Sequence, residues 1–365
     1  MLTDQTTSTP AGPNPREARL QRLAALKPKE FRAGESLVHI TAFGPEPYPL
    51  LIGPACPDTD LYTWVSNHAG QVETLLQKHG ALLFRGFPVH SVEAFEAFLA
   101  ALGGKPLQYV HRSSPRHEVQ NNIYTSTDHP HDQVINLHNE HSYSHEWPLK
   151  IVFHCLVAPA DAGETPIADS RKVFAALREP TRRQFIDKGV KYVRHMGTGL
   201  GMRWQDVFQT TDKGRAEAFC RQYGMTYQWL DQDRLRLEFT RPAVRRHPRT
   251  HEPVWFNHAF FFNLRSYDET LREAVLAQGK AEDFPFLTYY GDGSEIPGEV
   301  IEEIRQAYEG LKVSFAWQKG DVLVLDNMLM AHGRNAYQGD RKILVGMLEP
   351  YQGQASVTDP TTIHS

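Results

Sequence analysis

Hydrophobic positions in the first hundred residues switch between helical and strand spacing. Between residues 61 and 78 they recur every three or four positions, at Leu61, Trp64, Val65, Ala69, Val72, Leu75 and Leu76, which is typical of an amphipathic helix. Gly80 ends this helix, and residues 81–87 (ALLFRGF) predict a short buried strand. A second helix is predicted at residues 92–102. This part of the chain therefore predicts helices packed against the edge of a sheet.

Beyond residue 104 the pattern changes to short apolar runs separated by turns that contain Gly and Pro. These runs predict strands at residues 122–124, 134–137, 150–156, 191–195, 235–240, 254–257, 313–315, 322–325 and 342–347. Helical interruptions are predicted at residues 171–177, 215–223, 270–277 and 297–308. Many short strands at irregular spacing favour a jelly roll or a similar barrel over βαβ units.

The N-terminal residues differ in composition from the rest. Residues 1–15 are rich in Thr, Ser, Pro and Gly, which predicts a disordered tail, and a short helical piece is predicted from Leu20 to Leu26. The chain of 365 residues is long enough for one large domain or two modest ones. We expect residues 16–365 to form a single domain, because barrels with insertions run long.

Composition and charge limit which binding partners and which cellular compartment are expected. The chain has 39 basic and 43 acidic residues, a formal charge of −4 and no long run of one sign, so neither nucleic acid nor a membrane is indicated as a partner. Three widely separated cysteines suit neither a disulfide framework nor a zinc ribbon and favour the cytoplasm. No apolar run approaches the roughly 18 residues of a membrane span.

The candidate chemistry begins with His138 and Glu140, two residues apart in the motif HNE. On a β-strand such residues project from the same face, so an imidazole and a carboxylate would point into one space. With one remote histidine they would form the facial triad that binds Fe(II) in non-haem oxygenases and leaves positions open for reactants. Taken alone, the motif fits a surface strand with a local hydrogen bond better than a metal site.

We nominate His332 as the third ligand. It follows the apolar stretch of residues 322–331 and precedes Gly333, a position that suits a barrel mouth. Its separation from His138, 332 − 138 = 194 residues, is compatible with a jelly roll, which brings distant strands side by side. Arg341 then precedes a buried apolar run, and a buried guanidinium needs an anionic partner. A cosubstrate carboxylate would fit, and ion pairs with Asp340 or Glu349 are the alternatives.

Several motifs together give the chain a family resemblance over roughly residues 75–347. They are HNE at 138–140, RGF at 85–87 after a short strand, GETPIADSR at 163–171, WFNH at 255–258 and the segment from His332 to Arg341. In combination they resemble the taurine-dioxygenase-like (clavaminate-synthase-like) family of Fe(II)/2-oxoglutarate oxygenases. Within it, the chain is similar to the branch that includes the syringomycin-pathway aspartyl hydroxylase.

The resemblance implies a fold that is mainly β with α insertions, a double-stranded β-helix (jelly-roll) core flanked by helices. It implies that His138, Glu140 and His332 bind iron, that Arg341 holds the distal carboxylate of 2-oxoglutarate, and that Thr165 also contacts this cosubstrate. The cofactors would be Fe(II), 2-oxoglutarate and O2. The chain carries Glu140 where many members have Asp, and Arg341 follows His332 more closely than in the taurine enzyme itself. The presence of a carboxylate at residue 140 argues against a halogenase, because related halogenases have a small residue there.

The expected reaction is hydroxylation of an aliphatic carbon of an amino acid, free or presented by a carrier protein, in specialised-metabolite biosynthesis. Arg203, Asn257 and Arg265 lie in the segment where this family tends to build its substrate pocket, and Arg334 either binds substrate or belongs to a loop. His131, His141 and His145 are expected outside the metal's coordination, with His141 facing away from it on a strand. A homo-oligomer is compatible with the sequence.

Other outcomes stay open. The same cofactors support desaturation, cyclisation or epimerisation of the substrate. A non-catalytic barrel that binds a small acid is an alternative of another class, and a zinc hydrolase using the same three ligands is a further one.

Overall fold

The computed structural model describes residues 37–107, 118–126, 129–197, 201–267, 269–278 and 284–353. The predicted tail at residues 1–15 and the short helix at Leu20 to Leu26 lie outside these ranges. The described residues from Val38 onward belong to one compact unit, a mixed α/β structure. No helix among them is long and apolar enough to cross a bilayer.

The N-terminal α+β part contains the strands β1 (Val38–Ala42), β2 (Leu50–Pro54) and β3 (Ala81–Phe84) and the helices α2 (Leu61–Asn67), α3 (Ala69–His79) and α4 (Val92–Leu102). Asp60 caps α2 by accepting hydrogen bonds from the backbone N–H groups of Tyr62 and Thr63. The single helix predicted at residues 61–78 is in fact two, because His68 leaves helical geometry and bonds through Nδ1 to the carbonyl of Trp64, 2.8 Å away. Gly80 ends α3 in the left-handed region, as predicted.

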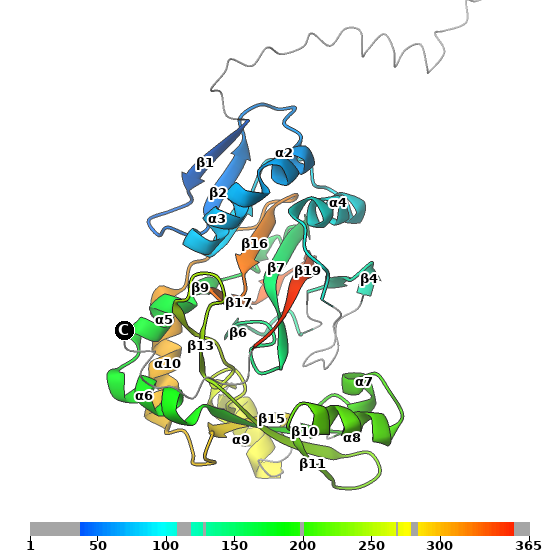
Figure 1. The fold of residues 1–365 in the computed structure, drawn as a ribbon, viewed down its shortest axis with the longest axis vertical. Helices are drawn as coiled ribbons and strands as arrows, with labels where there is room; N and C mark the ends of the chain where they lie inside the picture. The colour runs from blue at the N-terminus through cyan, green and yellow to red at the C-terminus, as the bar shows by residue number, and fades with distance from the viewer. Residues whose placement is uncertain are drawn as a thin grey trace, which may run out of the picture. The chain divides into compact units, whose positions relative to one another are not determined.

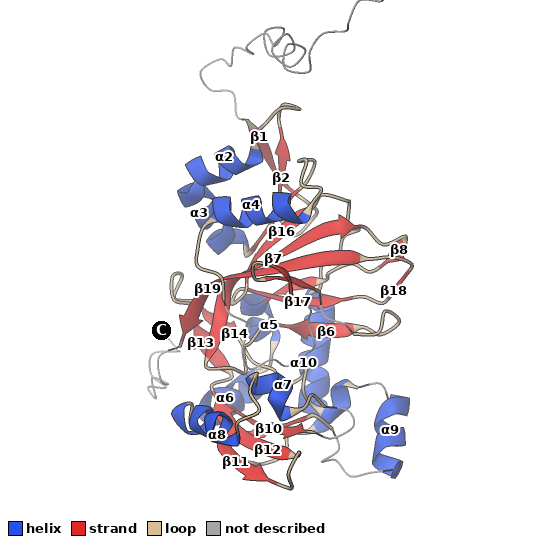
Figure 2. Ribbon diagram, turned by 90° about the vertical axis from the view of Figure 1, so that its right-hand side faces the viewer, coloured by secondary structure: helices blue, strands red, loops and turns tan. Residues whose placement is uncertain are grey.

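The largest sheet has eight strands in the order β1-β2-β3-β16-β7-β19-β5-β4 (Figure 2). Its remaining members are β4 (Glu118–Gln120), β5 (Ile123–Thr125), β7 (Glu146–Val157), β16 (Val322–Asp326) and β19 (Lys342–Gln352). Among its described strands, only β2 and β3 pair in parallel. The long strand β7 lies between β16 and β19, with Val152 opposite Val324 and Phe153 opposite Val345. Its neighbours therefore come from the last 50 residues of the chain.

A second, three-stranded sheet has the order β6-β17-β9, formed by β6 (Ile135–His138), β17 (Met330–Arg334) and β9 (Ile167–Asp169). The short strands β8 (Asp161–Ala162) and β18 (Tyr337–Gln338) pair with each other next to it (Figure 2). One hydrophobic core joins Ile151, Phe153 and Val345 of the large sheet to Ile167 and Met330 of the small one. The two sheets therefore pack face to face over a shared core.

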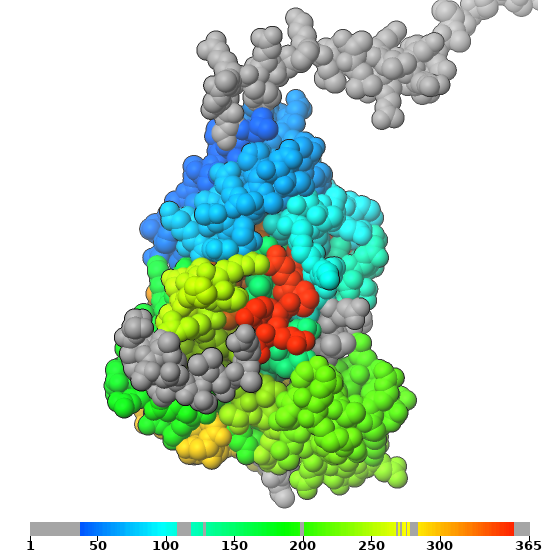
Figure 3. Space-filling view, viewed as in Figure 1, coloured from blue at the N-terminus to red at the C-terminus, as the bar shows by residue number. Residues whose placement is uncertain are grey.

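Most of the remaining described residues form a second lobe around another core, to which the small sheet also contributes Leu137, Ala168 and Ala331 (Figure 1). Its sheet has the order β11-β12-β10-β15, from β10 (Val190–Met196), β11 (Thr226–Trp229), β12 (Leu235–Arg241) and β15 (Phe286–Tyr290). The accompanying elements are α5 (Ser170–Ala176), α6 (Glu179–Lys188), α7 (Trp204–Phe208), α8 (Lys213–Gln222), β13 (Val244–Arg246), β14 (Pro253–Trp255), η1 (Leu264–Ser266), α9 (Glu269–Gln278) and α10 (Gly298–Leu311). In Figure 3 the red residues at the end of β19 reach the surface between the blue N-terminal part and the green residues of this lobe.

The predicted helices at 171–177, 215–223, 270–277 and 297–308 are confirmed as α5, α8, α9 and α10. The prediction of a mainly β chain with α insertions is confirmed only in part, because the described residues form a mixed α/β structure, in which helices such as α6 and α7 were not anticipated. Helix α6 buries only Thr181 and Phe185, so its sequence carries little helical periodicity. The strand predicted at 313–315 is reduced to a single bridge between Val313 and Ile167.

Candidate metal centre

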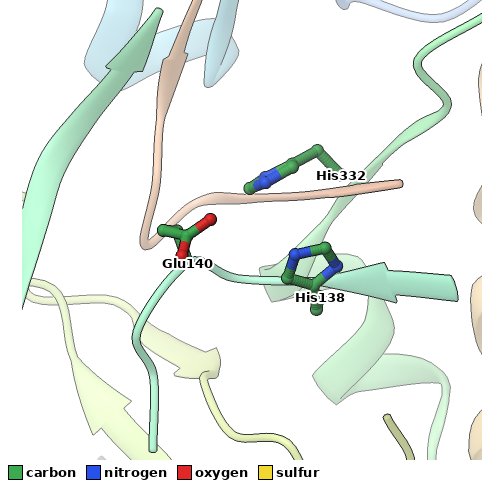
Figure 4. Close-up of side chains that lie close together, drawn as sticks. All are labelled: His138, Glu140 and His332. Carbon is green, nitrogen blue, oxygen red and sulfur yellow. The ribbon is translucent and has the colours of Figure 1, made fainter. Parts of the chain in front are cut away.

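The structure brings His138, Glu140 and His332 together (Figure 4). One ligand atom from each of the three side chains lies within 4.8 Å of the other two. Among the residues the structure describes, no other three His, Cys, Asp or Glu side chains gather in this way. Glu140 and His332 are buried and His138 is partly so. Two imidazoles and one carboxylate within this distance suit a single divalent cation.

The two histidines are held in register by backbone pairing. His332 of β17 lies opposite His138 of β6, and their ring centroids are 4.7 Å apart. Between His332 and Arg334 stands Gly333, where a Cβ atom would come within 2.5 Å of the carbonyl oxygen of Ile135. The close approach of β6 to β17 therefore needs glycine at this position.

The tautomer of His138 can be inferred from its neighbour. Its Nδ1 atom lies 2.9 Å from the carbonyl oxygen of Asn136, an acceptor, so Nδ1 carries the hydrogen. The Nε2 lone pair is then available to a cation, the arrangement usual for metal-binding histidines. The donor set thus fits a divalent metal in chemistry as well as in spacing.

Glu140 reaches the centre by a different route from the one predicted. Strand β6 ends at His138, and Glu140 lies in the turn that follows, so the two side chains do not share a strand face. His141 does not face away as predicted, because its Nε2 atom lies 3.6 Å from Oε1 of Glu140, but it stands outside the group of three ligand atoms, as expected. The chain turns sharply there, with His141 in the left-handed region at φ 58°.

Aromatic rings surround the two histidine ligands. The ring of Phe261 lies 4.4 Å from that of His138, and the ring of Phe153 lies 5.1 Å from that of His332, measured between centroids. Apolar rings at these distances exclude water from two sides of the centre and lower the local dielectric constant.

His258 also adjoins the centre, and sequence reasoning did not nominate it. Its ring centroid is 5.6 Å from that of His138, and its Nδ1 atom lies 2.6 Å from Oγ of Ser142. Burial, followed by the repulsion that a protonated His138 would exert, holds the pKa of His258 well below its usual range. The WFNH motif contained it, but nothing in the spacing of that motif pointed to the metal ligands.

Arg341 and Thr165 lie together, as the resemblance implied. An NH2 atom of Arg341 is 3.4 Å from Oγ1 of Thr165, and its Nε donates to the carbonyl oxygen of Gly163 at 2.9 Å. Thr165 also accepts from Nε1 of Trp317 and stands two residues before Ile167, which pairs with His332. Both residues therefore lie on segments that adjoin the metal ligands.

The guanidinium of Arg341 has no carboxylate partner among the described residues. The alternative partner Glu349 is engaged by Lys150 and Arg249 instead. Burial, followed by the charge of Arg334, lowers the pKa of Arg341 to about 10. A cation mostly withdrawn from water and lacking an anion is costly, which favours an anionic ligand at this point.

Three of the four predicted substrate residues are engaged elsewhere. Arg203 is exposed and pairs with Asp206 at 3.1 Å. Asn257 is buried, but its amide donates to the carbonyl of Ala243 and accepts from the N–H of Ala259, each at 2.8 Å. Arg265 is exposed on η1, against Gly298 at the start of α10. These contacts do not test substrate binding, so the predicted substrate roles of all three stay predictions.

Arg334 is buried and fastens a loop. It donates to the carbonyl oxygens of His129, Pro130 and Gln133, which precede β6. Of the alternatives left open by the sequence, the contacts favour the loop. His131 is exposed, and His145 stacks on Tyr223 with centroids 3.4 Å apart, so both stand outside the metal cluster, as expected. The buried state of Trp147, Trp204, Trp255 and Trp317 agrees with a core role.

The donor set and the paired sheets define a class, because two histidines and one carboxylate form the ligand set of the mononuclear non-haem iron oxygenases. The comparisons with known proteins agree. A model of the taurine catabolism dioxygenase TauD, TfdA family matches residues 44–348. The chain belongs to this family, and the predicted enzyme class, an Fe(II)/2-oxoglutarate-dependent oxygenase, is confirmed by that membership.

Two relatives extend over most of the chain. It is 34% identical over 304 residues to the dapdiamide synthesis protein DdaC of Enterobacter agglomerans, covering 83% of this chain and 92% of the relative. It is 30% identical over 289 residues to a clavaminate synthase-like protein of Arabidopsis thaliana, covering 76% and 83%.

Two solved structures share the fold. PvcB of Pseudomonas aeruginosa matches with a TM-score of 0.51 and 16% identity, covering 87% of this chain and 93% of that one. A taurine dioxygenase from Burkholderia xenovorans matches with a TM-score of 0.50 and 16% identity, covering 90% and 98%. At this identity the likeness concerns the fold.

Proposed function

We propose that this chain holds Fe(II) through His138, Glu140 and His332 and uses 2-oxoglutarate and O2 to hydroxylate an aliphatic carbon of an amino acid. The observation that carries the assignment is the meeting of these three side chains, with ligand atoms within 4.8 Å of one another, from positions up to 194 residues apart (332 − 138). Membership of a dioxygenase family supports iron over other divalent metals.

The proposed core is a double-stranded β-helix. Its two faces would be the central strands β16, β7 and β19 of the large sheet and the small sheet β6-β17-β9, which pack over one hydrophobic core. Residues 16–365 would then act as one oxygenase domain, with the second lobe as an insertion that borders the site.

Iron bound to this donor set would supply the chemistry, which couples oxidative decarboxylation of 2-oxoglutarate to the insertion of oxygen into a C–H bond. The chain's own residues would hold the metal, orient the reactants and enclose the site. His138 and His332 offer neutral nitrogens and Glu140 one negative charge, which leaves coordination positions for reactants. Phe153 and Phe261 keep water from the histidine side.

Arg341 is proposed to bind the distal carboxylate of 2-oxoglutarate, with Thr165 donating to the same group. A planar guanidinium binds a carboxylate through two parallel charge-assisted hydrogen bonds. Formal charges support this choice: a divalent metal, one carboxylate and one guanidinium sum to +2, which a dianion such as 2-oxoglutarate neutralises.

The substrate class rests on the relatives. The name of DdaC places that protein in dapdiamide synthesis, which supports a role for this chain in making a specialised metabolite. The substrate would be an amino acid, free or loaded on a carrier protein, with desaturation, cyclisation or epimerisation as alternative outcomes. We also propose a cytoplasmic location, in keeping with the lack of a disulfide among the described cysteines, Cys56, Cys155 and Cys220.

The test is an anaerobic reconstitution with Fe(II), followed by oxygen exposure in the presence of 2-oxoglutarate and a panel of free and carrier-loaded amino acids. The expected result is succinate release that depends on iron and a product heavier by one oxygen atom. His138→Ala should abolish both, and His131→Ala, an exposed histidine outside the cluster, should abolish neither. Binding of 2-oxoglutarate without turnover on any substrate would favour the small-acid-binding barrel, and zinc-dependent hydrolysis would favour a hydrolase.

A further inference from the structure

Glu140 lacks the support that the histidine ligands receive from strand pairing. His138 and His332 are opposite each other on β6 and β17, whereas Glu140 lies beyond the end of β6. A carboxylate on a turn needs another device to hold it near the two imidazoles.

That device is the side chain of Asn327. Its Oδ1 atom accepts from the backbone N–H of Glu140 at 2.8 Å, and its Nδ2 atom donates to the carbonyl oxygen of the same residue at 2.9 Å. One primary amide thus satisfies both backbone groups of the ligand residue, as a neighbouring strand would. Asn327 is fully buried, so water does not compete for these bonds.

Asn327 is itself held by hydrogen bonds to β7 and to Asn139. Its backbone N–H donates to the carbonyl of Leu149 at 2.8 Å, and its Nδ2 atom donates a second bond to the carbonyl of Pro148 at 2.9 Å. Its own carbonyl accepts from Nδ2 of Asn139, the residue between the two ligands, at 2.8 Å. The turn that carries Glu140 is therefore bonded to the start of β7 through one residue.

The turn at Asp326 connects this residue to His332. One carboxylate oxygen of Asp326 accepts from the backbone N–H groups of Met328 and Leu329 at 3.0 and 3.1 Å. The other lies 3.0 Å from Nε2 of His247, a buried histidine. Strand β17 begins directly afterwards at Met330, so the segment that holds Glu140 continues into the strand that presents His332.

We propose that Asn327 is a positioning residue for the metal centre, which sets the distance between the carboxylate of Glu140 and the two imidazoles. The inference rests on the proposed function, since it concerns the metal that function requires. Losing the amide would leave two buried backbone groups of Glu140 unsatisfied, and the turn would relax away from the centre. Groups that orient metal ligands typically change metal affinity by about 10- to 100-fold when removed.

The experiment compares Asn327→Leu with Asn263→Leu in the full chain. Asn263 is also a buried asparagine with two side-chain hydrogen bonds, to Thr288 and to the N–H of Arg265, and it has no bond to a metal ligand. Co(II) is titrated anaerobically by visible absorption, and unfolding of the metal-free proteins is followed in EDTA. We expect Asn327→Leu to bind Co(II) at least about 10-fold more weakly than Asn263→Leu and to alter the Co(II) spectrum.

Asn327→Asp serves as a second variant if the leucine variant does not fold. It keeps the acceptor for the N–H of Glu140 and removes the two donated bonds, so an intermediate loss of Co(II) affinity is expected. Co(II) binding by the Asn327 variants as tight as by Asn263→Leu, while wild type binds normally, would overturn the inference alone. Wild-type protein that binds neither Co(II) nor Fe(II) would overturn the proposed function and this inference with it.

Discussion

Replacing Arg341 by Met should stabilise the ligand-free protein while destroying its response to 2-oxoglutarate. Burial and the charge of Arg334 lower the pKa of Arg341 to about 10. Because a pKa unit corresponds to about 1.36 kcal/mol, this lowering represents roughly 3 kcal/mol of unfavourable free energy in the folded state at neutral pH. The bond to the carbonyl of Gly163 at 2.9 Å offsets about 1 kcal/mol. A methionine of similar length should therefore add about 1–2 kcal/mol to the free energy of unfolding.

The ligand-bound state should show the opposite effect. Two charge-assisted hydrogen bonds from a guanidinium contribute about 1.5–3 kcal/mol each, so their loss should raise the KM for 2-oxoglutarate by at least about 100-fold. The metal ligands are untouched, so Co(II) should still bind Arg341→Met with wild-type affinity.

The assay is thermal unfolding of metal-loaded protein with and without 2-oxoglutarate, together with the KM for 2-oxoglutarate from succinate release. Arg203→Met is the matched control, because that guanidinium is exposed and paired with Asp206. If Arg341→Met unfolded at a lower temperature than wild type without ligand and kept its KM, the guanidinium would not be an unpaired charge awaiting a carboxylate, and the reasoning would fail.

Three further outcomes are expected. Gly333→Ala should weaken Co(II) binding measured by titration, because its Cβ atom would come within 2.5 Å of the Ile135 carbonyl oxygen and push β6 away from β17; unchanged affinity would contradict this. Burial lowers the pKa of His154 to about 4, against about 6.5 in an unfolded chain, so the free energy of unfolding should fall as the pH drops from about 6.5 to about 4. His154→Phe should remove about 2 kcal/mol of the difference between urea unfolding at pH 7 and at pH 5, and an equal pH dependence in both proteins would disprove the assignment. Arg265→Ala should leave the KM values of both substrates unchanged in steady-state assays, since Arg265 is exposed on η1.

The sequence predicted the members of the proposed site better than the way they are held. His138, Glu140 and His332 meet as expected, and Arg341 lies beside Thr165. The predicted reason was a strand face shared by His138 and Glu140, yet the strand ends at His138. Alternation along a strand is visible in a sequence, whereas a turn held by a side chain 187 residues away is not.

The predicted substrate residues show the same limit. Arg203, Asn257 and Arg265 were chosen because they lie in the segment where the family tends to build its substrate pocket. The direction in which each polar side chain points is decided by its local partners, which the sequence does not show. Asp206 attracts Arg203, and the backbone of Ala243 and Ala259 occupies Asn257. His258 was missed because its proximity to His138 depends on tertiary packing between distant segments of the chain.

Because β7 lies in the middle of the large sheet, it can pair with its neighbours only late in protein synthesis. Both of its sheet neighbours, β16 and β19, are translated more than 150 residues later than β7 itself. A ribosome that has just finished β7 thus exposes an apolar strand with two open edges, a state prone to aggregation and to chaperone capture. Iron cannot be loaded at that stage either, since the strand that presents His332 emerges only near the end of translation.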